Sequence, residues 1–484
     1  MIGPHSFPDY RGVLEYRCLS CEARYGIDEL LYTCPVCDGV FLIEDTTFER
    51  LAETSGRAWR ERFDTRAAWK HPAFRGIFRY YELIAPVIEM DDIVCLGEGH
   101  THIVAASPAL QRKIGQPFAF KNDGQNPSAS FKDRGMACVF SYIKFMIRRH
   151  RWNQMLTVCA STGDTSASAA LYAAYVGWPI KSIVLLPQGK VTPQQLAQTL
   201  GSGATVLEVP GVFDDCMEVV EHLADRYRVA LLNSKNAWRI LGQESYVYEV
   251  AQWYDWNLTN KSLFVPIGNA GNITAIMSGL LKLHVLGVIE GLPRIFGVQS
   301  HHADPVFQYY AEPDPKRRKY QAVPVRPSVA QAAMIGNPVS FPRVKHFSER
   351  YMHAAGPDAF QIVKVTEQAI IEGMLLANRH GHTACTQGGE CLAGLIAVRE
   401  QGRISQDELA VLDATAHSLK FIKFQDMYFA DNFPSEYEIH VRPELSNAPQ
   451  LIIAPEERER LDQPAYVRVV AETVAQLLNL ERRS

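Results

Sequence analysis

From about residue 155 onward, short runs rich in β-branched apolar residues alternate with segments of helical periodicity. The runs predict strands at residues 155–159, 182–186, 204–209, 262–265, 294–298 and 409–412. The periodic segments predict helices at residues 165–176, 192–200, 214–226, 272–288, 366–379 and 389–400. Because strands that alternate with helices form parallel sheets covered on both faces, this pattern predicts an α/β protein.

The charge and the composition exclude several classes of partner. The 484 residues carry a formal net charge of −4, which leaves no global basic field for nucleic acid or anionic lipid. The first residues lack the features of an export signal, and no stretch approaches the roughly 18 apolar residues of a membrane span. Cysteines outside the paired motifs are scattered through apolar segments, as in a reducing compartment. We therefore expect a cytoplasmic protein with neither a nucleic-acid nor a membrane partner.

Four cysteines near the N-terminus have the spacing of a metal site. Cys18 and Cys21 form one CxxC pair, and Cys34 and Cys37 form a second pair. Four thiolates satisfy tetrahedral zinc, and two CxxC turns can aim their sulfurs at one point. The alternative, a chance arrangement, is disfavoured because the whole chain has 10 cysteines. Since the neighbouring residues are acidic, we expect a zinc ribbon with a structural role rather than a nucleic-acid-binding one.

One lysine stands in an unusual segment. Lys132 lies in NPSASFKDRG, between small polar residues and an apolar helix predicted for residues 136–147. Burial and the dipole at a helix start both disfavour a charged lysine. A lysine with a neutral amine can form a Schiff base. The alternative for a lone lysine is a solvated surface charge.

Three further segments follow predicted strands, at the sheet edge where ligands bind in parallel α/β proteins. Residues 160–166, ASTGDTS, offer hydroxyls and amides at a helix start, although such residues are also ordinary helix caps. Residues 266–272, PIGNAGN, have glycines that let the backbone wrap an anion, without the spacing of a nucleotide-binding loop. Residues 413–420, DATAHSLK, follow the last strand.

These segments resemble the motifs of the threonine synthases, which belong to the tryptophan-synthase-β class of pyridoxal-phosphate enzymes. NPSASFKDRG resembles NPTGSFKDRG, CASTGDTSASAA resembles ASTGDTSAA, GNAGN resembles the loop for the cofactor phosphate, and ATAHSLKF resembles STAHGLKF. The matches occur in the family's order over roughly residues 95–425. The resemblance implies two doubly wound, mostly parallel open sheets, here preceded by the zinc ribbon.

The resemblance also implies individual roles around pyridoxal 5'-phosphate. Lys132 is the expected Schiff-base lysine, Thr415 is expected to face the pyridine nitrogen, and Asp164 is expected beside the ring hydroxyl. The expected residues for the cofactor phosphate are Gly268, Asn269, Ala270, Gly271 and Asn272. The expected residues for a phosphorylated amino-acid substrate are Ser161, Thr162, Thr165, Ser234 and Arg239. An ordinary surface position on a helix is the alternative for Arg239.

The implied reaction converts O-phospho-L-homoserine and water to L-threonine and inorganic phosphate. His102, Ala129 and Ser418 depart from the family pattern, which has Pro at the first position and Gly at the other two. The departures leave open a second enzyme of this fold, a β-replacement enzyme or dehydratase that acts on O-phosphoserine or threonine. A third hypothesis, from another class, is a zinc-ribbon binding protein with an inactive core.

We expect three parts along the chain. Residues 1–50 contain the zinc ribbon, and residues 51–425 form the catalytic core, whose smaller subdomain covers about residues 100–225. Residues 426–484 form an extension with an amphipathic helix at 465–480, a packing or dimer element. A homodimer is expected from the family. Six histidines are interpreted as structural: His100, His102, His301, His302, His382 and His417.

Overall fold

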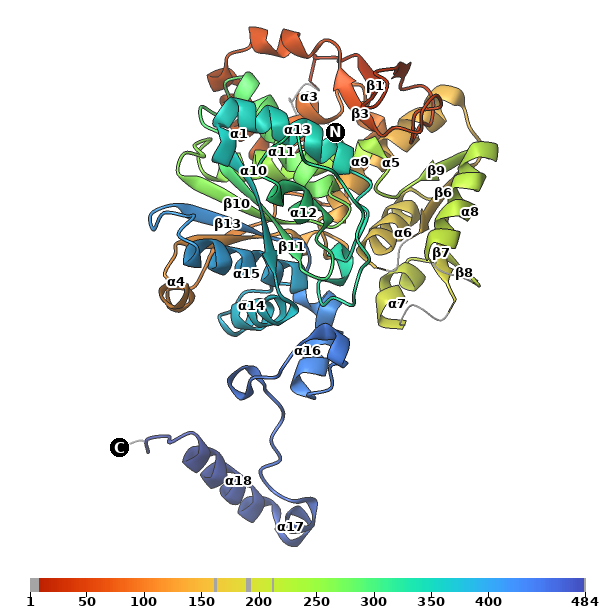
Figure 1. The fold of residues 1–484 in the computed structure, drawn as a ribbon. Helices are drawn as coiled ribbons and strands as arrows, with labels where there is room; N and C mark the ends of the chain where they lie inside the picture. The colour runs from red at the N-terminus through yellow and green to blue at the C-terminus, as the bar shows by residue number, and fades with distance from the viewer. Residues whose placement is uncertain (1–7, 161–162, 189–192, 211–212, 483–484) are drawn as a thin grey trace.

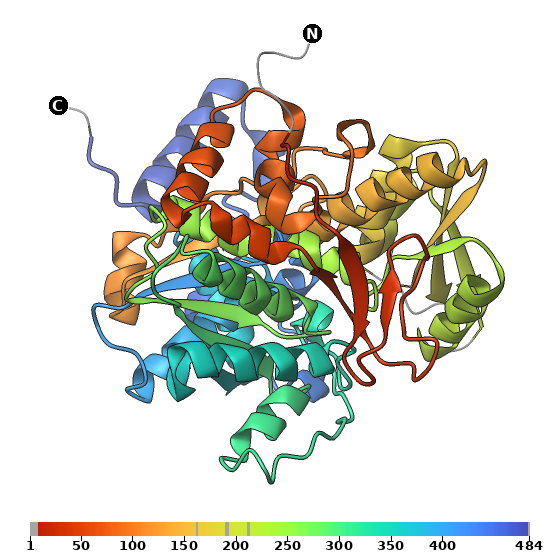
Figure 2. The same ribbon diagram turned by 90° about the horizontal axis from the view of Figure 1, so that it is seen from above.

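A computed structural model describes residues 8–160, 163–188, 193–210 and 213–482. The N-terminal part is a small antiparallel sheet in the order β2-β1-β3, with β1 at Leu14–Cys18, β2 at Arg24–Gly26 and β3 at Phe41–Asp45. Seen from above, these strands lie over the boundary between two α/β parts (Figure 2). Arg343 donates to the Phe41 carbonyl of β3, and the Tyr32 hydroxyl donates to the Val229 carbonyl, so the N-terminal part contacts both α/β parts.

The larger α/β part contains a six-stranded sheet in the order β12-β11-β10-β13-β5-β4. Its strands are β4 (Ile103–Ala105), β5 (Phe118–Asn122), β10 (Lys261–Pro266), β11 (Arg294–Ser300), β12 (Phe360–Val365) and β13 (Leu409–Ala414). All neighbouring pairs are parallel except β4 with β5. Helices α10, α11 and α13 cover one face, and α14 and α15 cover the other (Figure 1).

The smaller α/β part contains a parallel four-stranded sheet in the order β8-β7-β6-β9. Its strands are β6 (Met155–Ala160), β7 (Ile180–Pro187), β8 (Thr205–Val209) and β9 (Val229–Leu231). Helices α6 and α8 pack against its strands. The two expected open, mostly parallel sheets are thus confirmed, whereas the segment boundaries 1–50, 51–425 and 426–484 stay predictions.

The helices of the core up to the middle of the chain are α1 (Gly56–Ala67), α2 (Pro72–Arg75), α3 (Tyr81–Ile84), α4 (Pro108–Ile114), α5 (Lys132–His150), α6 (Asp164–Val176), α7 (Pro193–Gly201), α8 (Phe213–Arg226) and α9 (Ala237–Gln243). The later helices are α10 (Ser245–Trp253), α11 (Gly271–Val285), α12 (Pro305–Ala311), α13 (Phe341–Ala355), α14 (Glu367–Arg379), α15 (Thr386–Glu400), α16 (Ile422–Phe429), α17 (Pro455–Arg460) and α18 (Gln463–Leu477). None of the described helices has both the length and the apolar character that crossing a membrane requires.

The six expected strands are all present, within two residues of their predicted bounds, but four further strands of the two α/β sheets were not predicted. β4 and β9 have three residues each, too few for an apolar pattern. β5 includes the buried Lys121, which interrupts its apolar run. β12 includes Gln361 and Lys364 between apolar residues. Short length and polar residues inside the sheet therefore concealed these strands.

Helix α5 begins four residues earlier than predicted, at Lys132 rather than at residue 136. The prediction treated the polar residues Asp133 and Arg134 as part of a loop. Both are fully buried in the structure, inside the first turn of the helix. The correction follows from their partners, because a buried charged residue is stable only when it is hydrogen-bonded.

A buried ion cluster surrounds Arg134. Its Nε and Nη2 atoms donate to the Asp123 carboxylate, each at 2.7 Å, and Nη1 and Nη2 donate to Glu249 at 2.8 Å. Lys121 Nζ donates to Glu249 Oε2 at 2.6 Å and to the carbonyl of Thr101 at 2.7 Å. Two cations and two carboxylates balance, so the cluster joins β5, α5 and α10 without a net charge.

Replacing Glu249 with Leu should lower the free energy of unfolding by about 3–5 kcal/mol, because Arg134 and Lys121 would lose their shared buried partner. Burial raises the pKa of Glu249, but the two cations hold the pKa well below its usual range. Urea denaturation measures the change. The control is Glu349→Leu, since Glu349 is exposed on α13 and its pair with Lys345 contributes little. Equal stability losses in the two variants would contradict this account.

Candidate active site

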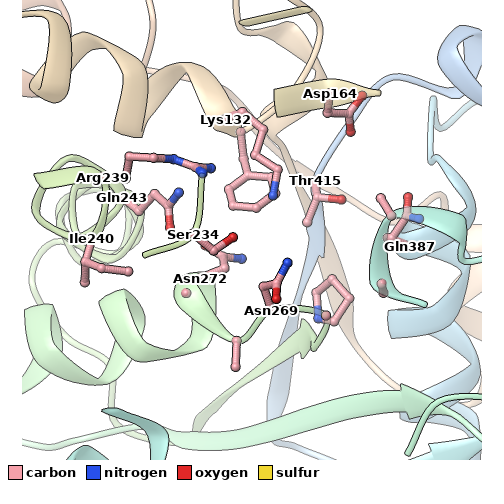
Figure 3. A pocket seen from close by; sticks show the side chains of 17 residues that line it. Lys132, Asp164, Ser234, Arg239, Ile240, Gln243, Asn269, Asn272, Gln387 and Thr415 are labelled. Atoms are coloured by element: carbon pink, nitrogen blue, oxygen red, sulfur yellow. The ribbon is translucent and has the colours of Figure 1, made fainter. Parts of the chain in front are cut away.

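A pocket lies at the carboxyl ends of β10 and β13 and at the start of α5 (Figure 3). Its lining residues are Phe131, Lys132, Asp164, Ser234, Arg239, Ile240, Gln243, Pro266, Gly268, Asn269, Ala270, Gly271, Asn272, Ala332, Ala333, Gln387 and Thr415. They come from segments far apart in the sequence and from both α/β parts. This location agrees with the general position of ligand sites in parallel α/β proteins.

Lys132 is the first residue of α5 and points into this pocket (Figure 3). Its Nζ atom lies 4.1 Å from the centroid of the Phe131 ring. Burial, followed by the positive charge of Arg239, lowers the pKa of Lys132 from 10.5 to about 7. A substantial fraction of the amine is therefore neutral near neutral pH, the state in which it acts as a nucleophile or base.

The backbone before Lys132 is held from two sides. Asp133 accepts hydrogen bonds from the backbone N–H of Ser128 at 2.6 Å and from its hydroxyl at 2.7 Å. The Phe131 N–H donates to the carbonyl of Thr415 at 2.8 Å. Ala129 has a φ of 63°, the left-handed conformation that favours glycine, so the structure explains the glycine of the family pattern at this position. These bonds fix where α5 begins.

The segment 268–272 joins β10 to α11. Its last two residues are the first two of α11, so their N–H groups lie at the positive end of the dipole of a 15-residue helix. Ala270, the residue before the helix, has a φ of 62°. A Cβ atom on Gly268 would lie 2.9 Å from Ala333 Cα and 3.0 Å from the Ala332 carbonyl, which only glycine avoids. The loop is therefore shaped to bring backbone amides close to an anion.

Asn272 and Asp413 form a buried pair behind this loop. Asn272 Nδ2 donates to Asp413 Oδ2 at 2.7 Å. Burial and then the charge of Asp123 raise the pKa of Asp413 well above its usual range. Asn272 Oδ1 is buried and has no hydrogen-bond partner among the described residues. The unused oxygen leaves one polar contact available on this side of the pocket.

Thr415 and Asp164 lie on another side of the pocket. Thr415 follows β13 and is buried, and its hydroxyl lies 3.6 Å from Cys385 Sγ. Asp164 is the first residue of α6 and forms an ion pair with Lys420, with 3.0 Å between Oδ1 and Nζ. Lys420 Nζ also donates to the Ser128 carbonyl at 2.9 Å. Lys420 thus ties the start of α6 to the loop that precedes Lys132.

Arg239 is a buried cation without a carboxylate partner among the described residues. It is 3% exposed, its Nη1 donates to the carbonyl of Leu232 at 3.2 Å, and its Nε has no partner. Burial lowers the pKa of Arg239 to about 10, so the guanidinium remains charged at neutral pH. Figure 3 shows Arg239 and Lys132 directed into the same pocket. A buried unpaired cation requires an anion, which the pocket can receive.

Most of the predicted site residues that the structure describes come together here, and one does not. Lys132, Asp164, Ser234, Arg239, residues 268–272 and Thr415 all line the pocket. Thr165 lies in the first turn of α6 and does not line it. Ser161 and Thr162 lie outside the described residues. The cluster therefore includes every described prediction for the cofactor and two of those for the substrate.

Two glutamines line the pocket without having been predicted. Gln387 is in the first turn of α15, and neither of its side-chain polar atoms has a partner among the described residues. Gln243 has an unpartnered Oε1 and lies four residues after Arg239 on α9, hence on the same helix face. That spacing was a usable signal for Gln243. For Gln387, we found no pattern in the sequence that indicates a place in the pocket.

The four N-terminal cysteines form a separate cluster. The Sγ atoms of Cys18 and Cys37 are 3.5 Å apart, those of Cys21 and Cys34 are 3.6 Å apart, and all four lie within 4.8 Å of one another. None forms a disulfide. Zinc–sulfur bonds of about 2.3 Å in a tetrahedron place neighbouring sulfurs about 3.8 Å apart, so the cluster fits zinc. No member of the cluster lines the pocket.

Buried hydrogen bonds connect the N-terminal sheet to the segment that carries Arg239. Trp238 Nε1 donates to the Tyr16 hydroxyl at 2.9 Å. Arg343, which is fully buried, donates to the carbonyl of Phe41 at 2.8 Å and to the carbonyl of Ser234 at 3.3 Å. The N-terminal sheet, whose first strand ends at Cys18, therefore supports the side of the pocket that carries Arg239.

Comparison with known proteins identifies the family. A family described as "Pyridoxal-phosphate dependent enzyme" matches residues 94–414. The chain belongs to this family. A threonine synthase of Methanocaldococcus jannaschii is 35% identical over 409 residues, covering 84% of this chain and 92% of the relative. Threonine synthase 2, chloroplastic, of Arabidopsis thaliana is 30% identical over 420 residues, covering 85% of this chain and 78% of the relative. The predicted resemblance to the threonine synthases is confirmed.

A solved structure shows the same fold. The crystal structure of threonine synthase from Escherichia coli aligns with a TM-score of 0.61 at 18% identity, covering 88% of this chain and 96% of that chain. Together with the family match, this likeness confirms the expected architecture of a pyridoxal-phosphate enzyme.

In the cofactor-free protein, Lys132→Met should stabilise the fold more at pH 7 than at pH 9. The depressed pKa means that, between pH 7 and 10, the unfolded chain binds more protons at Lys132 than the folded chain does. The contribution of Lys132 to stability therefore rises with pH, and the advantage of removing it shrinks. Urea denaturation at both pH values measures this. The control is Lys113→Met, since Lys113 is an exposed lysine on α4. An equal gain from Lys132→Met at both pH values would contradict the assignment.

Proposed function

We propose that this chain is a threonine synthase that converts O-phospho-L-homoserine and water to L-threonine and inorganic phosphate. The observation that supports this substrate is the buried guanidinium of Arg239, which has no carboxylate partner among the described residues and lies in the same pocket as Lys132. A phosphate group on the substrate would supply the missing negative charge, and arginine suits two-point binding of phosphate. The family match supports the cofactor chemistry.

The pocket fits pyridoxal 5'-phosphate by the character of its groups. Residues 268–272 offer backbone amides at a helix start for the phosphate, and Lys132 offers an amine that is partly neutral near pH 7 for covalent attachment. When bound, this cofactor withdraws electrons and so stabilises negative charge on the carbons of an attached amino acid. Thr415 would meet the ring nitrogen with a neutral hydroxyl, and Asp164 would lie beside the ring hydroxyl.

Lys132 would also move protons. A base with a pKa of about 7 can remove a proton at one carbon and return it at another near neutral pH. The reaction needs proton removal at Cα and at Cβ, departure of phosphate from Cγ, addition of water at Cβ and reprotonation. Arg239 and Ser234 would hold the phosphate and stabilise its charge as it leaves, together with Ser161, Thr162 and Thr165.

We also propose the metal, the location in the cell, the oligomeric state and the division of the chain into parts. Cys18, Cys21, Cys34 and Cys37 bind one structural zinc ion, which would close the N-terminal ribbon without a free coordination position. We further propose a cytoplasmic homodimer divided into residues 1–50, 51–425 and 426–484. The absence of any described buried residue on α18 is compatible with a role in subunit contact.

Arg239→Met should lower kcat/KM for O-phospho-L-homoserine by tens-fold or more. Loss of a buried charged partner costs about 2–5 kcal/mol, and the substrate phosphate would then be buried without its cation. Phosphate release measures the rate. The visible absorption of the bound cofactor should remain, because Arg239 is not assigned to the cofactor. The control is Arg112→Met, an exposed position on α4.

The same assay distinguishes a threonine synthase from the alternative, a β-replacement enzyme or dehydratase of the same fold. O-phosphoserine with sulfite or sulfide, and threonine alone, are offered beside O-phospho-L-homoserine. Turnover of either alternative, without phosphate release from O-phospho-L-homoserine, would make the chain a β-replacement enzyme or a dehydratase. An unchanged kcat/KM in the Arg239 variant would remove Arg239 from the phosphate site.

Cys34→Ser should lower stability more than it alters the cofactor spectrum. Cys34 is fully buried, and a structural zinc site contributes its binding free energy to folding. After dialysis against a chelator, the parent protein should retain about one zinc ion per chain and the variant should retain less. Metal analysis measures both contents. Comparable zinc content and melting temperature in both proteins would reject a zinc ribbon.

A further inference from the structure

A second group of metal-binding side chains lies outside the pocket and the cysteine cluster. His301 and His302 directly follow β11, and Glu438 follows a short 3-10 helix at Ser435–Tyr437 in the C-terminal extension. One ligand atom from each of the three residues lies within 4.8 Å of the others. His301 Nε2 is 2.9 Å from Glu438 Oε2, and His302 Nε2 is 3.5 Å from the same oxygen.

The hydrogen bonds on the far side of each ring orient these nitrogens. His302 Nδ1 lies 2.6 Å from the Pro327 carbonyl, and His301 Nδ1 lies 3.3 Å from the Val365 carbonyl. Because a carbonyl can only accept, each Nδ1 must carry the proton. Glu438 Oε2 can likewise only accept, so the 2.9 Å contact from His301 Nε2 is a hydrogen bond in which the ring donates. A metal ion between the rings and the carboxylate would replace this hydrogen bond, and both Nε2 atoms would then present lone pairs to the ion. Metal-binding histidines typically have this arrangement, with the outer nitrogen bonded to a carbonyl or carboxylate.

His302 gives an independent indication that something is bound there. The residue is 2% exposed, and its Nε2 has no hydrogen-bond partner among the described residues. A buried polar atom left without a partner is costly, and it points here at an oxygen that also offers lone pairs. A cation between the two atoms would satisfy both.

The carboxylate of Glu438 is prepared for this role. Arg326 Nη1 donates to Glu438 Oε1 at 2.5 Å, which leaves Oε2 facing the histidines. The side chain of Glu438 is 49% exposed and that of His301 is 21% exposed, so an ion can reach the site from solvent. In a tetrahedral zinc site with bonds of about 2.0–2.1 Å, ligand atoms lie about 3.3 Å apart. The two distances to Glu438 Oε2 bracket that value.

We propose that His301, His302 and Glu438 bind one zinc ion, with water in the fourth position. Two imidazoles and one carboxylate suit zinc, whereas calcium and magnesium prefer oxygen ligands. The ion would join the C-terminal extension to the end of β11, since Glu438 comes from the former and both histidines from the latter. This site is independent of the proposed reaction and differs from the four-cysteine site in having an exchangeable ion.

The test uses the full-length holoenzyme. The protein is dialysed against a chelator, then equilibrated with excess Zn²⁺, passed through a desalting column and analysed for metal. The parent should regain about one zinc ion per chain beyond the content retained by the cysteines. His302→Gln and Glu438→Gln should each weaken binding of this ion at least about tenfold. Glu436→Gln is the matched control, since Glu436 is exposed two residues away, and it should bind like the parent.

A second readout separates binding here from nonspecific binding. Hydrogen exchange in the peptide around residues 430–446 should slow on zinc addition in the parent and in Glu436→Gln, but not in Glu438→Gln. Failure of the parent to take up an exchangeable zinc ion would overturn the proposal. So would equal uptake and equal protection in the Glu438 and Glu436 variants.

Discussion

The buried ion cluster around Arg134 fixes the segment on which the active site depends. Arg134 binds Asp123 and Glu249, and the preceding residue, Asp133, binds the backbone and hydroxyl of Ser128. Lys132 precedes both of these anchored residues. Its side chain is therefore held at the start of α5 by two neighbours whose partners lie on other elements. The sequence Lys-Asp-Arg thus combines one reactive residue with two that position it.

The arginines of this core differ in how their charges are balanced. Arg134 is matched by carboxylates, so it contributes little net charge to its surroundings. Arg239 is buried without a carboxylate, and its charge helps to keep the pKa of Lys132 near 7. The same uncompensated charge is available to an anionic substrate. Under the proposed function, one residue would therefore affect both the base and the binding of phosphate, which would link the two halves of the chemistry.

The sequence predicted the parts of this protein whose signals are local. Strand and helix alternation predicted parallel α/β sheets, the motifs marked Lys132 and residues 268–272, and the family resemblance implied that there are two sheets. Lys121 concealed β5, because a lysine in the sequence normally indicates the end of a buried strand. In the structure it is buried and donates a hydrogen bond to Glu249, which is distant in the sequence. Gln387 and the group around His302 were missed for a similar reason. Their partners come from distant segments, so no local pattern exposes their role, and His302 was interpreted as structural.

The central claim is that phosphate leaves by cleavage of the carbon–oxygen bond at Cγ and that water adds at Cβ. The most direct measurement is turnover of O-phospho-L-homoserine in ¹⁸O-labelled water, with mass spectrometry of both products. The account predicts label in the hydroxyl group of threonine and none in the released phosphate. Label in the phosphate, with homoserine as the other product, would show hydrolysis of the phosphate ester and contradict the account.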